Sequence, residues 1–194
     1  MIRLRYPVVL ASASPRRQEL LRRFVPEFEV VPAHLDEDAL TCEDPAQTAC
    51  RLAREKALAV FESHPDSLVI AGDTVVALPQ PDGSFVQLSK PIDASDAIRM
   101  LSILSGRSHW VITGLALRWP AGFSCEAEQT QVFFRKLDPA EVEAYVETGE
   151  PMDKAGGYGI QAGASPFIDR IEGSWSNVVG LPLERLEEAL KGVR

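Results

Sequence analysis

The sequence predicts an α/β fold in which helices flank a mixed β-sheet. Apolar segments of strand length alternate with segments of helical periodicity along the whole chain, a pattern typical of α/β proteins. Glycine, proline and other turn residues separate these segments, and capping residues precede most of the helical ones. No repeat, low-complexity tract or linker interrupts the order. We therefore expect residues 1–194 to form a single continuous α/β domain, bent into two lobes around a cleft.

The N-terminal part of the chain predicts a strand, a helix, a strand and a longer helix. Residues 7–11 have the apolar pattern of a buried strand. Ser14 is a good N-cap and Pro15 a good first helical residue, so a helix is expected to about residue 24. A second strand is expected at residues 28–31, and Pro45 begins a helix that extends to about residue 63.

The middle of the chain predicts a long strand, a hairpin and a capped helix. Residues 68–78 are apolar and rich in β-branched side chains. Turn residues follow at 79–83, so residues 85–88 are expected to pair back as a hairpin. Asp93 then caps a helix that Gly106 ends as its C′ residue.

The C-terminal part predicts a strand pair, a helix and a glycine-rich segment before the last elements. Residues 109–119 alternate as a long strand does, and 130–134 resemble its partner. Asp138 and Glu141 form a near capping box for a helix to about residue 148. The remaining expected segments are an irregular glycine-rich stretch at 153–163, a short strand at 167–171 and a helix at 183–191.

Composition excludes several classes of function. The chain has 20 basic and 28 acidic residues and a net charge of −8, which opposes general nucleic-acid binding. Its three cysteines form no C-x-x-C pair and indicate reduced thiols rather than a disulfide framework or zinc ribbon. No apolar stretch approaches the roughly 20 residues of a membrane span, and the N-terminal apolar run is too short for a signal peptide. We expect a cytoplasmic protein without membrane or nucleic-acid partners.

Asp73 is the residue that most clearly contradicts its local pattern. It lies within an apolar, β-branched run, where a carboxylate is costly to desolvate unless a charged group faces it. Gly72 before it permits a close approach or a bulge. A divalent cation or a water to be activated would explain Asp73, and a strand break with Asp73 in a turn is the alternative.

A second unusual segment is the turn that leads into the first helix. Arg16 and Arg17 occupy the first helical turn, where the macrodipole disfavours positive charge. With the hydroxyls of Ser12 and Ser14 and the free amides of the helix, they would make a phosphate site. Two solvated arginines that tolerate a small dipole penalty are the alternative.

Other candidate residues stand farther along the chain. Lys56 falls on the apolar face of its helix, so it either extends to the edge of that face or points into a cleft. Lys90 could present a second ammonium, and Glu37 belongs to an acidic run of the kind usually solvated. Gln161 follows a glycine-rich segment that a ligand could approach closely, and its amide could read a base edge.

The three histidines share no ligand spacing and no nucleophile motif, which disfavours zinc and serine-hydrolase chemistry. Cations and carboxylates without a covalent nucleophile suit hydrolysis of a phosphoanhydride by an activated water.

At these residues the chain resembles the Maf family of nucleotide pyrophosphatases, and the matching segments occur in family order over essentially the whole chain. These segments are LASASPRRQELL (10–21), AREKA (53–57), GDTVV (72–76), KP (90–91), LSGRSH (104–109), EPMDKAGGYGIQ (150–161) and VGLP (179–182).

The resemblance implies a fold like that of inosine-triphosphate pyrophosphatases, and a homodimer. It also implies hydrolysis of a nucleoside triphosphate between the α- and β-phosphates, with Mg²⁺ or Mn²⁺ as cofactor. Asp73 matches the family's proton acceptor. The positions that match those handling substrate or metal are Arg16, Glu37, Lys56 and Lys90.

Substrate preference is implied by three further residues. Arg17, Thr74 and Gln161 match the branch that acts on dTTP and UTP. Two departures lie beside them: Ala71 precedes Gly72 where many members have the reverse order, and Ala162 stands where glycine is usual. These changes could alter backbone geometry near the base.

The resulting hypothesis is a pyrophosphatase acting on dTTP and UTP, with CTP or modified pyrimidine nucleotides as further candidate substrates. Ser12, Ser14, Arg16, Lys56 and Lys90 would hold the triphosphate, and Asp73 with Glu37 would bind the metal. Arg17, Thr74 and Gln161 would select the base. A 7-methyl-GTP pyrophosphatase and a nucleotide-binding regulator of cell division without turnover are the alternatives.

Overall fold

The computed structural model describes residues 4–161 and 163–193 and contains a mixed sheet of seven strands. Its order is β2-β1-β3-β5-β6-β7, and β4 pairs with β3 beside this path. β1 is parallel to β2 and β3, and every other pairing is antiparallel. The strands are β1 (Val8–Leu10), β2 (Glu29–Val30), β3 (Leu68–Pro79), β4 (Phe85–Leu88), β5 (Ser108–Trp119), β6 (Gly122–Phe134) and β7 (Ile168–Glu172). The predicted α/β class with a mixed sheet is confirmed.

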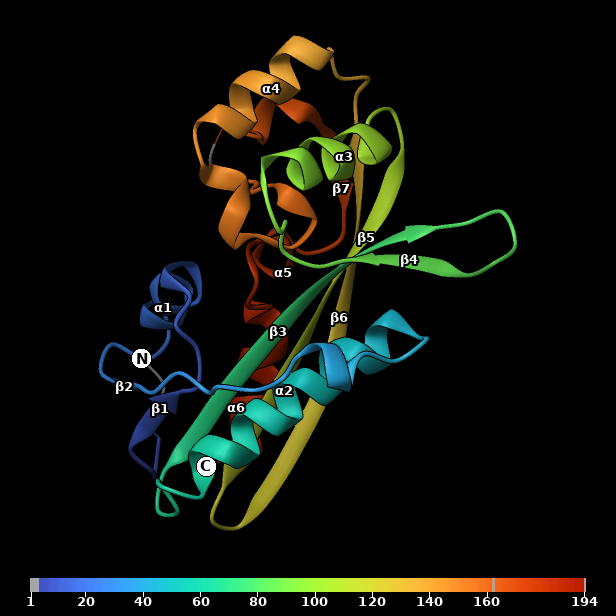
Figure 1. Cartoon of the computed structure of the whole chain (residues 1–194). Coiled ribbons are helices and arrows are strands. Elements are labelled where there is room, and N and C mark those ends of the chain that lie inside the picture. The colour runs from blue at the N-terminus through green and yellow to red at the C-terminus, as the bar shows by residue number, and fades with distance from the viewer. Residues whose placement is uncertain (1–3, 162, 194) are drawn as a thin grey trace.

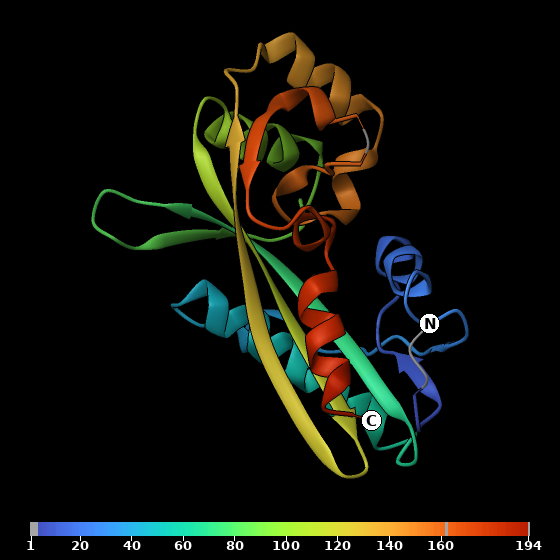
Figure 2. The same cartoon turned by 180° about the vertical axis from the view of Figure 1, so that it is seen from behind.

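Three long strands, β3, β5 and β6, run through both halves of the molecule (Figures 1 and 2). The lower lobe, as drawn in Figure 1, contains β1, β2 and three helices, and the upper lobe contains β7 and two helices. The lower helices are α1 (Pro15–Arg22), α2 (Pro45–Phe61) and α6 (Leu183–Lys191), and the upper ones are α3 (Ala94–Leu104) and α4 (Pro139–Glu147). The short helix α5 (Trp175–Val179) lies between the lobes.

Helices cover both faces of the sheet in the lower lobe. α2 lies in front of β3 and β5 in Figure 1, and α6 lies on the opposite face, as Figure 2 shows. Successive strand residues alternate between these faces. Ile70 packs with Leu186 of α6, whereas Ala71 packs with Ala53 of α2. Asp73, two residues after Ala71, therefore faces the α2 side.

Small residues bring α2 close to the sheet. Gly114 of β5 lies so near α2 that an added Cβ would stand 2.2 Å from the carbonyl oxygen of Ala49. No side chain fits at that distance, so glycine is required there. The helix consequently places its side chains directly against β3, β5 and the adjoining part of β6.

The upper lobe has its own apolar core. α3 contributes Leu101 and Leu104, and α4 contributes Val142. The rings of Phe134 and Tyr158 belong to the same core and pack edge to face against each other. The expected caps are present. Asp93 accepts from the Asp96 amide, and Asp138 forms a complete capping box with Glu141. The described residues also form the 3-10 turns η1 (Asp38–Leu40), η2 (Glu150–Asp153), η3 (Ala155–Gly157) and η4 (Ser165–Phe167).

Two elements differ from the sequence expectation. β6 begins at Gly122, eight residues before the predicted start at 130, because its register comes from pairing with β5 rather than from apolar alternation. α5 has only five residues and was not predicted, since such a short helix shows no periodicity. Among the described residues, no helix is long and apolar enough to cross a membrane.

Candidate active site

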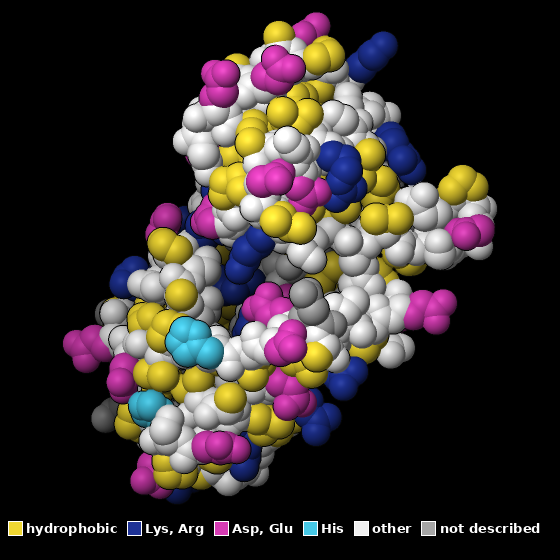
Figure 3. All heavy atoms as spheres, in the orientation of Figure 1, with side chains coloured by type: hydrophobic (Ala, Val, Ile, Leu, Met, Phe, Trp, Pro, Cys, Tyr) yellow, Lys and Arg dark blue, Asp and Glu magenta, His cyan; other side chains and the backbone are white. Residues whose placement is uncertain are grey.

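A gap along one edge of β3 forms the floor of a cleft between the two lobes. β1 pairs with β3 as far as Ile70, and β4 pairs with it from Val76 onward. Between these points the described strands leave residues 71–75 paired only with β5. A cleft of about 820 Å³ opens over this gap between the two lobes, which is a size suited to a small ligand. Figure 3 shows basic and acidic side chains together in the hollow.

Lys56 joins two carboxylates in this cleft. Its Nζ lies 2.6 Å from Asp73 Oδ1 and 2.6 Å from Glu37 Oε1. The Lys56 and Asp73 side chains are each 11% exposed, whereas Glu37 is 45% exposed at the rim. Asp73 is thus in an unbroken strand and faces the opposite charge that the sequence argument required. Lys56 points into the cleft instead of extending to the edge of its helix.

Neighbouring cations act on Glu37. Partial burial alone would raise the pKa of this carboxyl, but the hydrogen bond from Lys56 and the charges of Lys56, Lys90 and Arg17 outweigh that effect. The net result is a pKa below the usual value for glutamate. Glu37 is therefore held as a carboxylate.

Thr74, on the opposite face of β3 from Asp73, belongs to a hydrogen-bonded arrangement around Arg17. The Arg17 guanidinium donates to Thr74 Oγ1 at 3.0 Å, to Ser12 Oγ at 3.2 Å and to the Gly180 carbonyl at 2.7 Å. Burial lowers the pKa of Arg17, although the nearby Asp73 charge opposes this. A guanidinium has five N–H donors and stays charged in proteins. Within the described chain, two donors remain for a ligand.

The segment around α5 supports the Thr74 side of the cleft. Thr74 Oγ1 lies 3.0 Å from Thr113 Oγ1, and the Thr113 hydroxyl donates to the Asn177 carbonyl at 3.0 Å. The Asn177 amide in turn donates to the Val111 carbonyl and to Thr130 Oγ1, both at 2.9 Å. These bonds fix the backbone that receives the Arg17 side chain.

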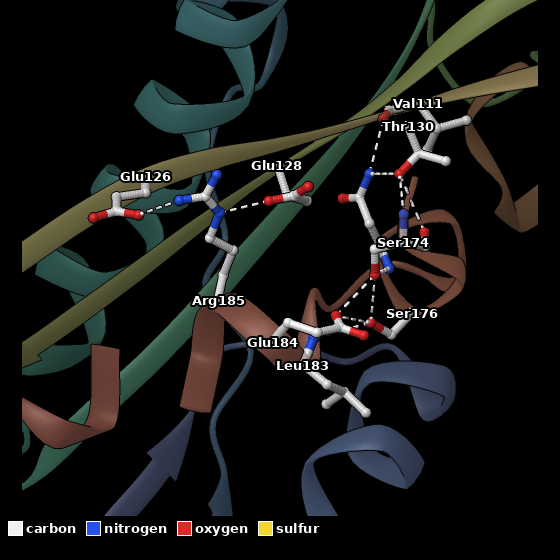
Figure 4. A network of polar contacts seen from close by, with 10 residues as sticks. Val111, Glu126, Glu128, Thr130, Ser174, Ser176, Leu183, Glu184 and Arg185 are labelled. Atoms are coloured by element: carbon white, nitrogen blue, oxygen red, sulfur yellow. Dashed lines mark hydrogen bonds and ion pairs between the residues drawn. The ribbon is translucent and has the colours of Figure 1, made fainter. Parts of the chain in front are cut away.

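Further polar contacts attach the same segment to the C-terminal helix and to β6 (Figure 4). Glu184 accepts from the hydroxyls of Ser174 and Ser176 at 2.9 and 3.0 Å. Arg185 donates to Glu128 at 2.5 Å and also pairs with Glu126, both on β6. The support of the Thr74 side therefore extends to α6 and β6.

An ion pair spans the cleft between the lobes. Arg16 Nη1 of α1 lies 2.9 Å from Asp153 Oδ2 of η2. Lys154 Nζ binds the other oxygen of Asp153 at 2.5 Å. Two cations thus flank one carboxylate at the mouth of the cleft. Although burial opposes it, the hydrogen bonds and charges of Lys154 and Arg16 hold the pKa of Asp153 below its ordinary value.

The remaining predicted residues also line the cleft. Ser14 caps α1, as expected, and its Oγ accepts from the Arg17 amide at 3.4 Å. Lys90 and Gln161 are exposed residues of the cleft lining. Ala162, the departure noted beside Gln161, lies outside the described residues. The cleft therefore brings together every predicted site residue.

The carboxylates are compatible with a divalent cation that binds together with its ligand. Asp73 and Glu37 converge on one point, the Lys56 ammonium. Residues 4–161 and 163–193 contain no group of three His, Cys, Asp or Glu side chains suited to holding a metal alone. Mg²⁺ commonly takes one or two protein carboxylates and completes its shell with phosphate oxygens and water. Two carboxylates meet that requirement.

Comparison with known proteins decides the family. A family model described as Maf-like protein matches residues 7–193. The chain belongs to the Maf family.

Related Maf proteins share nearly half of its sequence. A protein of Koribacter versatilis (strain Ellin345) is 46% identical over 95% of this chain and 93% of its own length. One of Syntrophomonas wolfei is 48% identical over 91% and 92%. Both relatives are named dTTP/UTP pyrophosphatase.

A solved structure shares the fold. The Ham1 protein of Staphylococcus aureus superposes with a TM-score of 0.51 at 14% identity and covers 97% of this Maf chain and 100% of its own. This likeness agrees with the mixed α/β fold that the sequence predicts.

Sequence reasoning missed several supporting residues of the Maf cleft. Thr113, Asn177 and Asp153 make contacts that only the fold brings together, because they lie 39 to 137 positions from their partners. Gly180 carried a usable signal: it stands in the matching VGLP segment, and its φ of 119° favours glycine.

Proposed function

We propose that this Maf protein hydrolyses dTTP and UTP to the nucleoside monophosphate and pyrophosphate. The observation that carries the proposal is the pairing of Asp73 and Glu37 at the Lys56 ammonium, in a cleft that Arg16, Arg17 and Lys90 also line. Cations on several sides suit a triphosphate, and a buried carboxylate at the floor suits an attacking water. The names of the relatives agree with this activity.

The phosphate chain would lie between the lobes. Arg16 exchanges Asp153 for a phosphate oxygen, and Lys90 contacts the chain from the exposed side. The hydroxyl of Ser12 and the amides at the start of α1 are further donors. A divalent cation held by Asp73 and Glu37 would supply charge neutralisation at the phosphates.

Asp73 would accept the proton of the attacking water. Lys56 binds its Oδ1 and fixes the carboxylate, which leaves Oδ2 to face the water. The water attacks the α-phosphorus, the bond to the bridging oxygen breaks, and pyrophosphate leaves. The bond from Lys56 keeps Asp73 oriented for this step.

The base would be selected on the Thr74 side of β3. Arg17 is fixed by three hydrogen bonds, so its two other donors have defined directions. Gln161 lines the same cleft as an exposed residue, and its amide has both donor and acceptor groups. A base that leaves buried polar groups unpaired is strongly disfavoured.

A substrate panel tests the activity. Purified protein with Mg²⁺ or Mn²⁺ is incubated with dTTP, UTP, CTP, dCTP, GTP and 7-methyl-GTP, and products are separated by ion exchange. We expect thymidine or uridine monophosphate with pyrophosphate, and ¹⁸O from labelled water in the monophosphate. A diphosphate with orthophosphate, or preference for 7-methyl-GTP, would contradict the proposal. Nucleotide binding without turnover would favour a regulator.

A further inference from the structure

Two cysteines outside the cleft meet where α2 packs on the sheet. Cys50 belongs to α2 and Cys125 to β6, 75 positions apart in the chain. The Cys125 Sγ lies 3.4 Å from the Cys50 carbonyl oxygen. Neither residue lines the cleft.

The fold explains why they meet. α2 approaches β5 most closely at Gly114, next to Cys50. On the neighbouring strand, Cys125 pairs with Ala116 of β5 and packs against the same cluster that contains Ala53 of α2. The contact therefore belongs to the packing of the helix on the sheet, and both residues are still partly exposed.

The contact prepares the two sulfurs for different roles. The neighbouring Cys125 thiol lowers the pKa of Cys50 to about 7, against burial and the charges of Asp44 and Glu126. The neighbouring Cys50 and burial raise the pKa of Cys125. The thiolate is the nucleophilic form of cysteine. Cys50 is consequently the attacking sulfur and Cys125 the thiol beside it.

We propose that Cys50 is an oxidation site for hydroperoxides, and that the reaction ends in a Cys50–Cys125 disulfide that links α2 to β6. The Cys50 thiolate attacks the peroxide, an S–O bond forms, and the O–O bond breaks with loss of hydroxide or alkoxide. Cys125 then attacks the Cys50 sulfenic acid, the S–S bond forms, and water leaves with the Cys125 proton. Two thiols are oxidised and one peroxide is reduced.

The disulfide would stabilise the fold. It closes a loop between positions 75 residues apart, and long loops lose the most unfolded-state entropy on cross-linking. We expect the oxidised protein to melt at a higher temperature than the reduced one. A reductant would restore the original melting temperature.

Mild oxidation of the full chain tests the site. Reduced protein is treated with a small excess of hydrogen peroxide, and thiols are counted by titration and intact mass. We expect the count to fall from three to one, with the mass lowered by two hydrogens and a peptide pair linking Cys50 to Cys125. Three free thiols, or disulfide-linked dimers, would overturn the proposal.

Cys42 provides the matched control. Its Sγ contacts the Leu40 carbonyl and Arg51 at 3.7 and 3.8 Å and neither of the other thiols. C42S should form the disulfide like the wild type. C125S should instead accumulate a Cys50 sulfenic acid that dimedone traps, and C50S should consume peroxide about tenfold more slowly. Dimedone labelling of Cys42 in C125S, with Cys50 unmodified, would contradict the assignment of the attacking sulfur.

Discussion

Asp73 and Thr74 are neighbours on β3, yet their surroundings differ in kind. Asp73 faces α2 and shares the Lys56 ammonium with Glu37, so its environment is one of charges. Thr74 faces Arg17 and Thr113, in hydrogen bonds that continue to Asn177. Strand alternation alone separates the two groups. The cleft can therefore hold reacting groups and recognition groups within one residue of each other.

The two sides are also supported differently. The Asp73 side depends on Lys56 and on Glu37 at the exposed rim. The Thr74 side is supported by buried bonds that reach β5, β6 and α5. We infer that the Asp73 side can rearrange around a cation and phosphates, whereas the Thr74 side stays fixed. The following predictions test this contrast, beginning with the largest effect.

The largest effect is expected from D73N. The amide cannot accept the proton of water, so kcat for dTTP should fall by roughly 10² to 10⁴-fold. Lys56 keeps Glu37 as a partner, so folding should be nearly unchanged. Pyrophosphate release and circular dichroism measure the two effects. Activity within tenfold of wild type would mean that Asp73 is not the proton acceptor.

K56M should both inactivate and destabilise the protein. Without the ammonium, Asp73 and Glu37 face each other with no cation between them. Removing one partner of a buried pair costs about 3 kcal/mol or more, measurable by urea unfolding. Millimolar Mg²⁺ should recover part of this loss if it occupies the same position. K90M, at an exposed lysine of the same cleft, is the control and should stay within about 0.5 kcal/mol of wild type.

T74V should change selectivity more than rate. The valine leaves Arg17 and Thr113 without the Thr74 hydroxyl, at a cost of about 1–3 kcal/mol. We expect the preference in kcat/KM for dTTP over dCTP to fall by about tenfold. T74S keeps the hydroxyl and should retain the preference. An equal loss in T74S would indicate that packing, not the hydrogen bond, sets selectivity.

The smallest effect concerns pH. Although burial opposes it, the hydrogen bond and charge of Lys56 lower the pKa of Glu37 below 4.5 in the folded protein. Its contribution to stability is thus fully present above pH 4.5 and is lost as the pH falls through that lower pKa. Because Glu37 is half exposed, the contribution should not exceed about 1 kcal/mol. The free energy of unfolding of E37Q, measured from pH 3 to 7, should fall less steeply with acid than that of wild type.

Much of the fold and the site could be predicted from the sequence because helix caps and charges within apolar segments are signals that neighbouring residues carry. The caps at Ser14, Asp93 and Asp138 begin helices as expected. Asp73 and Lys56 were each noticed for a charge in an apolar pattern, and the fold pairs them. A charged residue within an apolar segment is informative because a buried charge requires an oppositely charged or hydrogen-bonding partner.

The rest of the site depended on contacts between distant segments. Nothing near Asp153 in the sequence indicates that Arg16 binds it across the cleft. Asn177 lies in a helix of five residues, too short to show a period. Its role comes from β5 and β6, which pass beside it. The roles of such residues can be recognised only when the register of the strands is known.

The most direct test of the contrast between the two sides is the ratio of kcat/KM for dTTP to that for dCTP, measured in wild type, D73N and T74V. We predict that D73N lowers both values by the same factor and leaves the ratio unchanged. T74V should lower the ratio and keep most of the kcat for dTTP. The opposite pattern, a changed ratio in D73N with an unchanged ratio in T74V, would contradict the assignment of chemistry to one face of β3 and recognition to the other.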